Sequence, residues 1–208
     1  MLRRTLLMAG AALAAGLIAL HGAEAEPLAS PGKPAPDFRA MDVNGKPVKL
    51  SDFRGKTVVL EWTNHECPFV QKHYNSGNMQ GLQKLAAGEG IVWLTLLSSA
   101  PGTQGHVSAT EAKQLNAERN AAPGNVLFDN DGKIGRMYGA QTTPHMYVID
   151  PKGVLAYIGA IDDKPSANPA DVATARNYVR DALAAVKAGK PMDPALTRAY
   201  GCSIKYSS

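Results

Sequence analysis

Long apolar runs, clusters of basic residues and cysteines are all scarce in this chain. The one long apolar run, at residues 6–20, is interrupted from His21 onward. A stable membrane anchor needs about 20 apolar residues, so we expect none here. The 22 Lys and Arg residues are scattered and not interleaved with aromatic residues, which argues against a nucleic-acid groove. Only two of the 208 residues are cysteine, Cys67 and Cys202, so thiol chemistry within the chain depends on this one pair.

The start of the chain has the features of a secretory signal. Arg3 and Arg4 supply a positive beginning, residues 6–20 an apolar core, and Ala23 and Ala25 the small residues of a cleavage site. We therefore expect a signal peptide at residues 1–25 and export to the periplasm or the medium, with twin-arginine export as an option. Removing it leaves 20 basic and 17 acidic residues, a formal charge of +3. Export would place both cysteines where disulfides form and persist.

The remaining sequence has the composition of one globular domain. The chain is 45% hydrophobic and 19% charged, and it contains no internal repeat. Residues 26–37 are rich in proline and small residues and predict an extended arm. We expect the domain to span residues 26–189 and a C-terminal tail carrying Cys202 to span residues 190–208.

Strand patterns alternate with helix patterns along this domain. Asn44-Gly45 marks a hairpin turn near its start, and Ser108 with Glu111 forms a capping box that starts a helix. The predicted strands lie at residues 38–41, 47–50, 57–62, 91–97, 125–128, 146–149 and 154–158. One helical stretch is predicted to start at Pro68, to be interrupted at residues 75–78 and then to resume. Two further helices are predicted at residues 109–119 and 134–138.

A last, long helix is predicted to begin at Asn168 and to end before Gly189. Asn168 suits its N-cap and Pro169 its first turn. Its apolar positions fall on one predicted face: Val172, Ala175, Val179, Leu183 and Val186. Together the elements predict an α/β fold with a central mixed β-sheet flanked by helices and an N-terminal β-hairpin extension.

Three segments resemble the redoxin (AhpC/TSA, peroxiredoxin-like) branch of the thioredoxin-fold superfamily. The first, within residues 34–60, contains PAPDF at residues 34–38 and NGKPVKLSDFRGKTVVL at residues 44–60. The others are CPFV at residues 67–70 and TPH at residues 143–145. The resemblance implies a thioredoxin-like fold. It also implies that Cys67 is the redox-active nucleophile and that Pro144 is a cis-proline lying opposite it.

The chain departs from two patterns of this superfamily. Thioredoxins have a second cysteine where this chain has Val70. Peroxiredoxins have a hydroxyl residue where it has Asn64 and a proline where it has Leu60. The peroxide-activating hydroxyl is therefore missing or displaced to Thr63. Peroxiredoxin-like thiol peroxidase activity stays open as an alternative.

Physical chemistry independently favours a reactive Cys67. A helix that starts at Pro68 presents free N–H groups to the sulfur, and these stabilise a thiolate. Positive charge on His65 and on Lys72 or His73 would add to this effect. Glu66 would oppose it. We expect Thr63, Asn64, Pro68 and Thr143 to be the substrate-binding or supporting residues around the nucleophile.

A reactive thiol needs a partner that returns it to its resting state, and Cys202 is the candidate within the chain. We expect an exported thiol-disulfide oxidoreductase in which Cys67 attacks, Cys202 arrives on a mobile tail to resolve the product, and an external thiol reductant restores both. A second interpretation is a permanent disulfide between them, which would stabilise the fold by about 5 kcal/mol in the chain-entropy model.

A non-enzymatic alternative is copper binding by His65, Cys67 and His145, which requires these three residues to converge on one face of the fold. The pair of nearby cysteines typical of such sites is absent, so the expectation is no metal and no cofactor. His73 and His106 are expected at the surface. The expected partners are a protein or small-molecule thiol, disulfide or peroxide and an external reductant, with no nucleic acid and no membrane anchor after signal cleavage.

Overall fold

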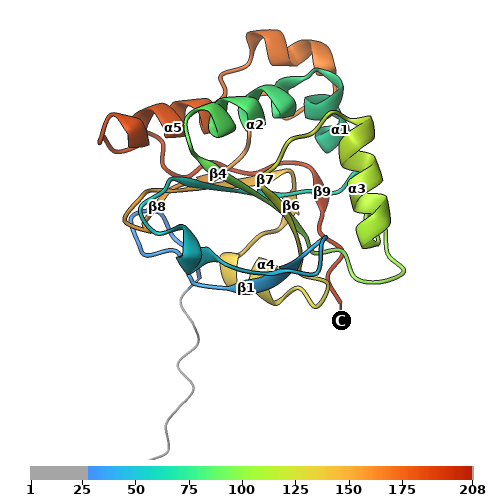
Figure 1. Cartoon of the computed structure of the whole chain (residues 1–208). Coiled ribbons are helices and arrows are strands. Elements are labelled where there is room, and N and C mark those ends of the chain that lie inside the picture. The colour runs from blue at the N-terminus through green and yellow to red at the C-terminus, as the bar shows by residue number, and fades with distance from the viewer. Residues whose placement is uncertain (1–27, 208) are drawn as a thin grey trace, which may run out of the picture.

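A seven-stranded mixed sheet forms the centre of the molecule (Figure 1). The computed structural model describes residues 28–207, so the predicted signal peptide lies outside the described residues. The strand order is β2-β1-β5-β4-β3-β7-β8. The strands are β1 (Arg39–Asp42), β2 (Pro47–Lys49), β3 (Val58–Trp62), β4 (Val92–Leu97), β5 (Asn125–Phe128), β7 (His145–Ile149) and β8 (Leu155–Gly159). This mixed α/β architecture is the predicted fold class.

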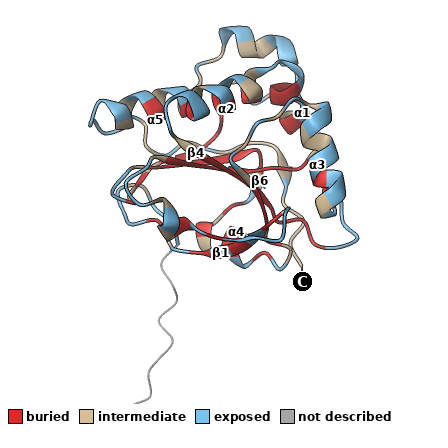
Figure 2. Ribbon diagram, viewed as in Figure 1, coloured by how far each residue is buried: buried red, intermediate tan, exposed pale blue. Residues whose placement is uncertain are grey.

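The three central strands β3, β4 and β5 are parallel. β1 and β7 pair antiparallel with β5 and β3, and the edge strands β2 and β8 pair antiparallel with β1 and β7. β3 aligns Leu60 with Leu94 on β4 and with Tyr147 on β7. All five residues of β3 are buried, as expected for a strand covered on both faces (Figure 2). The hydrophobic run predicted at residues 57–62 therefore forms the middle of the sheet.

Helices cover both faces of this sheet. They are η1 (Leu50–Phe53), α1 (Pro68–Asn75), α2 (Asn78–Gly88), α3 (Ala109–Glu118), α4 (Lys133–Tyr138), η2 (Pro169–Thr174) and α5 (Tyr178–Lys187). On one face α1, α2 and α5 pack over an apolar core that includes Val59, Leu82 and Val179. On the other face α4 and the N-terminal hairpin enclose a second core around Trp62 and Tyr138. Figure 1 shows the sheet lying between these two layers.

The expected single helix over residues 168–189 is wrong. Asn168 does cap a helical turn, but that turn is the short 3-10 helix η2, and the chain becomes extended again at Ala175. Asn177 then caps α5, its side chain accepting from the Arg180 N–H at 2.9 Å. Val172 and Ala175 are therefore not on the core face, whereas Val179 and Leu183 are buried. Two asparagines that can each cap a helix divide the predicted helix into two.

Other predicted elements are confirmed. The hairpin at Asn44-Gly45 joins β1 to β2, and the side chain of Ser108 accepts from the Glu111 N–H to start α3. The N-terminal arm runs beside β8, where the Gly32 N–H donates to the Leu155 carbonyl at 2.7 Å. Within residues 28–207 no helix is both long enough and apolar enough to cross a membrane.

Candidate active site

Cys67 lies at the corner between β3 and α1. It is the N-cap of α1, in extended conformation, and Pro68 occupies the first helical position. Its own N–H donates to the Asn64 carbonyl at 3.1 Å, and its carbonyl accepts from the Gln71 N–H at 2.9 Å. The predicted strand-to-helix corner is confirmed, and the turn holds the sulfur next to the free N–H groups of the helix.

The turn before Cys67 is fixed by its own polar side chains. The Asn64 side-chain oxygen accepts from the Glu66 N–H at 2.9 Å, and the Glu66 carboxylate accepts from the Gly105 N–H at 2.6 Å. A Cβ on Gly105 would lie 2.4 Å from the Asn64 side chain, so glycine lets this loop pack closely. Thr63 is buried, and its hydroxyl has no partner among the described residues.

Thr143 and Pro144 lie directly opposite Cys67. The bond between them is cis, as the resemblance implies. The Cys67 thiol donates to the Thr143 carbonyl at 3.1 Å. Thr143 is itself buried in the two-residue strand β6 (Thr142–Thr143). The expected neighbourhood of Cys67, Thr143 and Pro144 is thus present in the folded chain.

Cys202 lies in a strand that pairs with β6 rather than on a mobile tail. β9 (Cys202–Ser203) pairs antiparallel with β6, with Cys202 opposite Thr143. A Cβ on Gly201 would lie 1.9 Å from the Thr143 carbonyl oxygen, and Gly201 has a φ of 136°. Only glycine allows the tail to approach the backbone so closely there. The expectation of a free segment was wrong because the tail adds a strand to β6.

Both cysteines are free thiols on either side of Thr143, whose carbonyl accepts from the Cys67 thiol and whose strand partner is Cys202. Burial of Cys67 acts to raise the pKa of its thiol. Hydrogen bonding from the thiol and N–H of Cys202, the Val70 N–H and the Thr143 side chain outweighs burial, so the pKa of Cys67 is lowered. The arrangement therefore favours the thiolate at Cys67.

Cys202 has the opposite tendency. Its burial, its hydrogen bond to Cys67 and the negative charge of the Cys67 thiolate raise the pKa of Cys202 to about 12. Of the two thiols, Cys67 therefore loses its proton more readily, and Cys202 retains its proton. Chemically, the pair can exchange electrons with a disulfide and close a disulfide of its own.

Lys72 and His73 do not supply the positive charge that the sequence led us to expect. Lys72 is buried in an ion pair with Asp162. His73 is also fully buried, not at the surface as expected, and burial with the nearby Lys72 charge lowers its pKa to about 4, although Asp162 opposes this. His73 is therefore neutral near pH 7, and hydrogen bonds rather than these cations act on Cys67.

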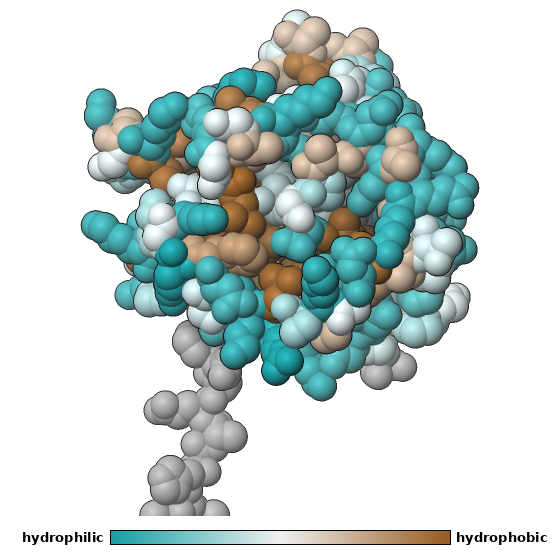
Figure 3. Space-filling model, viewed as in Figure 1, coloured by the Kyte–Doolittle hydropathy of each residue, from teal (hydrophilic) through white to brown (hydrophobic). Residues whose placement is uncertain are grey.

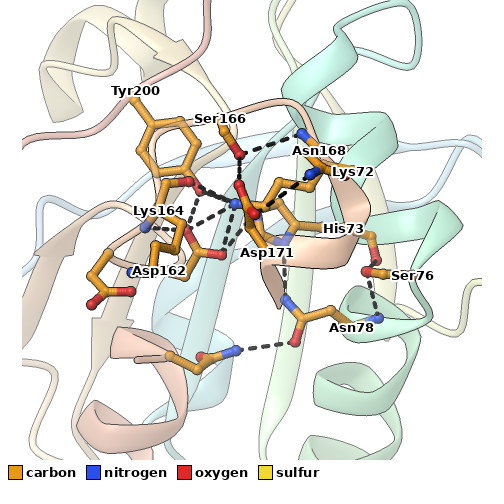
Figure 4. A network of polar contacts seen from close by, with 12 residues as sticks. Lys72, His73, Ser76, Asn78, Asp162, Lys164, Ser166, Asn168, Asp171 and Tyr200 are labelled. Carbon is orange, nitrogen blue, oxygen red and sulfur yellow. Dashed lines mark hydrogen bonds and ion pairs between the residues drawn. The ribbon is translucent and has the colours of Figure 1, made fainter. Parts of the chain in front are cut away.

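Two groups of residues near this corner were missed by the sequence analysis. Glu61, within the hydrophobic run of β3, is fully buried and accepts from Tyr74, Trp93 and Thr95. Tyr200, on the tail, enters a buried polar network with α1 (Figure 4). The glutamate within an apolar strand was a detectable signal for the first group. No sequence pattern marks the second, because its members come from distant segments.

The three residues considered for copper do not form a metal cluster. His65 lines a surface cavity with His106, Glu111 and Glu118. His145 is buried, and its ring packs on Tyr147 with centroids 4.8 Å apart. Among residues 28–207, no group of three or more His, Cys, Asp or Glu side chains has the arrangement of a metal site. The described geometry therefore offers no support for copper binding.

The two cysteines differ in their exposure to solvent. Cys67 has 0% of its surface exposed, whereas Cys202 is partly exposed. A cavity of about 550 Å³ lies along the segment that precedes Cys202, with Thr142, Tyr200 and Gly201 among its lining residues, and neither cysteine lines it. The face in Figure 3 is mainly hydrophilic, with hydrophobic residues gathered near its centre. Cys202 is therefore the more accessible of the two sulfurs in the described structure.

The central sheet, its helical layers and the cysteine at a helix start opposite a cis-proline define a thioredoxin-fold protein. Residues 31–158 match the model of the AhpC/TSA family. Because this match includes more than half of the chain, the protein belongs to the AhpC/TSA family.

Several known proteins are similar to this chain in sequence and in fold. The chain is 26% identical over 134 residues to the thiol-disulfide oxidoreductase ResA of Geobacillus thermodenitrificans, a match that includes 61% of this chain and 67% of that protein. An uncharacterized conserved protein of Geobacillus kaustophilus has a similar structure, with a TM-score of 0.72, 25% identity and coverage of 88% of this chain and 94% of that one. A hypothetical protein of Sinorhizobium meliloti also has a similar structure, with a TM-score of 0.70, 23% identity and coverage of 86% of this chain and 96% of that one.

Proposed function

We propose that the protein is an exported thiol-disulfide oxidoreductase in which Cys67 is the nucleophile and Cys202 the resolving cysteine. The observation that carries this proposal is the position of Cys202 on β9, in register with Thr143, whose carbonyl accepts from the Cys67 thiol at the start of α1. Membership of a redoxin family and similarity to proteins named thiol-disulfide oxidoreductase support the same chemistry. Export is supported by the leader-like sequence at residues 1–25.

The proposed cycle begins when the tail that carries Cys202 moves away from Cys67, which has no exposed surface in the described structure. The Cys67 thiolate then attacks one sulfur of a substrate disulfide. The substrate S–S bond breaks, a Cys67–substrate mixed disulfide forms, and the first substrate thiolate leaves and takes up a proton. Cys202 then loses its proton and attacks the Cys67 sulfur. The second substrate thiol leaves, and a Cys67–Cys202 disulfide remains.

Two electrons have then passed from the protein to the substrate. An external dithiol reductant returns them by breaking the Cys67–Cys202 disulfide. The same steps run in reverse when the partner is more oxidising. The geometry suits the resolving step because β9 already holds Cys202 beside Cys67.

Peroxide reduction is the enzymatic alternative, and the described turn gives it less support. The Asn64 side chain stands where a peroxidase hydroxyl is expected, and its oxygen is engaged by the Glu66 N–H. A permanent structural disulfide is the other alternative. The low pKa of Cys67 favours a reactive sulfur over this interpretation.

Rapid mixing of the reduced protein with oxidised glutathione or hydrogen peroxide tests the proposal. We expect the glutathione reaction to yield the Cys67–Cys202 disulfide, and added dithiol reductant to sustain repeated turnover. Cys67→Ser should abolish the reaction, whereas Cys202→Ser should accumulate a mixed disulfide at Cys67, detected by mass spectrometry after acid quenching. Faster oxidation by peroxide would instead assign a peroxidase, and a disulfide that no thiol reductant opens in the folded protein would assign a structural staple.

A further inference from the structure

A buried polar network connects the helix that carries Cys67 with the tail that carries Cys202 (Figure 4). Its centre is an ion pair between Lys72 on α1 and Asp162, which follows β8. Lys72 Nζ lies 2.9 Å from Asp162 Oδ2, and the two side chains are 0% and 1% exposed. Lys72 Nζ also donates to the Lys164 carbonyl at 2.6 Å. Buried charges are costly unless paired and hydrogen-bonded, so this pair has one strongly preferred geometry.

The hydroxyl of Tyr200 occupies the middle of this network. It accepts from Lys72 Nζ at 3.2 Å and donates to Asp162 Oδ1. His73 Nε2 lies 3.3 Å from the same hydroxyl, and the Asn78 amide donates to His73 Nδ1 at 2.9 Å. Because Nδ1 of the neutral ring accepts, its proton is on Nε2, which donates to Tyr200. One hydroxyl therefore joins two donors and one acceptor, all from outside the tail.

Tyr200 lies close to the reacting pair in sequence and in space. Only Gly201 separates it from Cys202, and Cys202 is in register with Thr143. On the other side, Lys72 belongs to the helix whose N-cap is Cys67. The network therefore ties the segment before Cys202 to the helix that begins at Cys67. The reaction described above uses neither the ion pair nor the tyrosine.

We propose that Tyr200 is a positioning residue, whose hydroxyl, fixed by Lys72 and Asp162, holds Cys202 against Cys67 and so favours closure of their disulfide. This inference rests on the proposed function. Two groups held in contact react as if one were at high concentration around the other. Without the hydroxyl, the segment at Gly201 has more freedom, and Cys202 spends less time beside Cys67.

The hydroxyl can be removed without removing the ring. The Tyr200 ring packs edge-on against Phe69, with centroids 5.8 Å apart, and Tyr200→Phe retains this contact. Tyr178→Phe is a matched control, because Tyr178 lines the same cavity. Its ring lies beside Tyr157 and Arg176, and its hydroxyl takes no part in the network of Figure 4.

The test is the equilibrium of each full-length protein with glutathione. The two protein thiols lose two electrons and two protons, which reduce one oxidised glutathione to two glutathione molecules. We expect Tyr200→Phe to make the Cys67–Cys202 disulfide about tenfold less favoured, which raises its reduction potential by about 30 mV. Tyr178→Phe should keep the wild-type potential. An unchanged potential in a folded Tyr200→Phe protein would overturn the proposal.

Asn78→Ala provides a second route if Tyr200→Phe does not fold. It removes the partner of His73 Nδ1 at a partly exposed position, so we expect a smaller shift in the same direction, and no shift would count against the proposal. Failure of the proposed function gives a different result, because the wild-type protein would then form no Cys67–Cys202 disulfide at any glutathione ratio.

Discussion

The acidity of the Cys67 thiol depends on which groups form hydrogen bonds with its sulfur. Burial opposes a charge on the thiol, and hydrogen bonding within a few ångströms reverses that effect. The Cys202 thiol is the strongest of these favourable contributors, ahead of the Val70 and Cys202 N–H groups and the Thr143 side chain. The low pKa of one cysteine is therefore in part a property of the other.

Replacing Cys202 should consequently change the acidity of Cys67. We expect Cys202→Ala to raise the pKa of Cys67 by about one unit, since a charge-assisted hydrogen bond contributes about 1.5–3 kcal/mol and part of it is offset by increased solvation. Cys202→Ser, which keeps a donor, should raise it less. The ultraviolet absorbance of the thiolate, followed as a function of pH, measures this without a reagent entering the site. Identical titrations in all three proteins would contradict the assigned hydrogen bond.

At the level of the secondary-structure elements, β3 contains a second unusual residue. Glu61 Oε2 accepts from Trp93 Nε1 at 2.8 Å and from the Thr95 hydroxyl at 3.2 Å, and its Oε1 accepts from the Tyr74 hydroxyl at 2.9 Å. These donors come from β4 and α1, so the carboxylate joins the central strand to its neighbours. A buried carboxylate persists only when its hydrogen bonds are complete, as they are here.

We expect Glu61→Met to lower the free energy of unfolding by about 3 kcal/mol, because it leaves the Trp93, Thr95 and Tyr74 donors buried without their acceptor. Denaturant unfolding of the reduced protein is the measurement. Adding Trp93→Phe removes one unpaired donor, so the double variant should lose less than the sum of the two single variants. Full additivity would show that the hydrogen bond to Trp93 has no energetic role.

Local sequence patterns predicted most elements and failed where a choice depended on packing. The hairpin, the capping box of α3 and the corner at Cys67 each have residues whose conformational preference is local. The helices near the end of the chain are not determined by such local preferences. Asn168 and Asn177 are both good caps, and only packing on β7 and β8 decides that α5 begins at the second one.

The candidate site was predictable on one side only. Cys67 and Pro144 were identified from motifs adjacent to clear strands. The docking of Cys202 on β6 depends on Gly201. Any larger residue at this position would place its Cβ against the Thr143 carbonyl oxygen across the strand pair. The network around Tyr200 likewise combines α1, the segment after β8 and the tail. Contacts between distant segments leave no periodic signal in a single sequence.

For the whole molecule, two buried histidines should make stability depend on pH. Burial lowers the pKa of His145 to about 4, and burial together with Lys72 does the same for His73. An unfolded histidine titrates near 6.5. Between about pH 4 and pH 6.5 the unfolded chain therefore binds more protons than the folded one, so stability rises with pH in this window and falls on acidification.

We expect each of these histidines to reduce the free energy of unfolding by about 2 kcal/mol between pH 7 and pH 5. Denaturant unfolding of the reduced protein at the two pH values measures the sum. His145→Gln should remove about half of the loss, whereas replacing the more exposed His106 in the same way should leave it intact. An equal loss in the wild-type and His145→Gln proteins would mean that His145 is not held neutral by the fold.

The burial of Cys67 next to the terminal strand β9 also affects how far oxidants can damage its sulfur. Thiolates exposed to oxidants progress beyond sulfenic acid to sulfinic and sulfonic acids, which thiols do not repair. Cys67 has no exposed surface in the described structure, and the Cys202 thiol lies close to it on β9. Condensation with that thiol would end the progression at a reversible stage. The same strand that limits entry to the sulfur thus protects it from permanent loss.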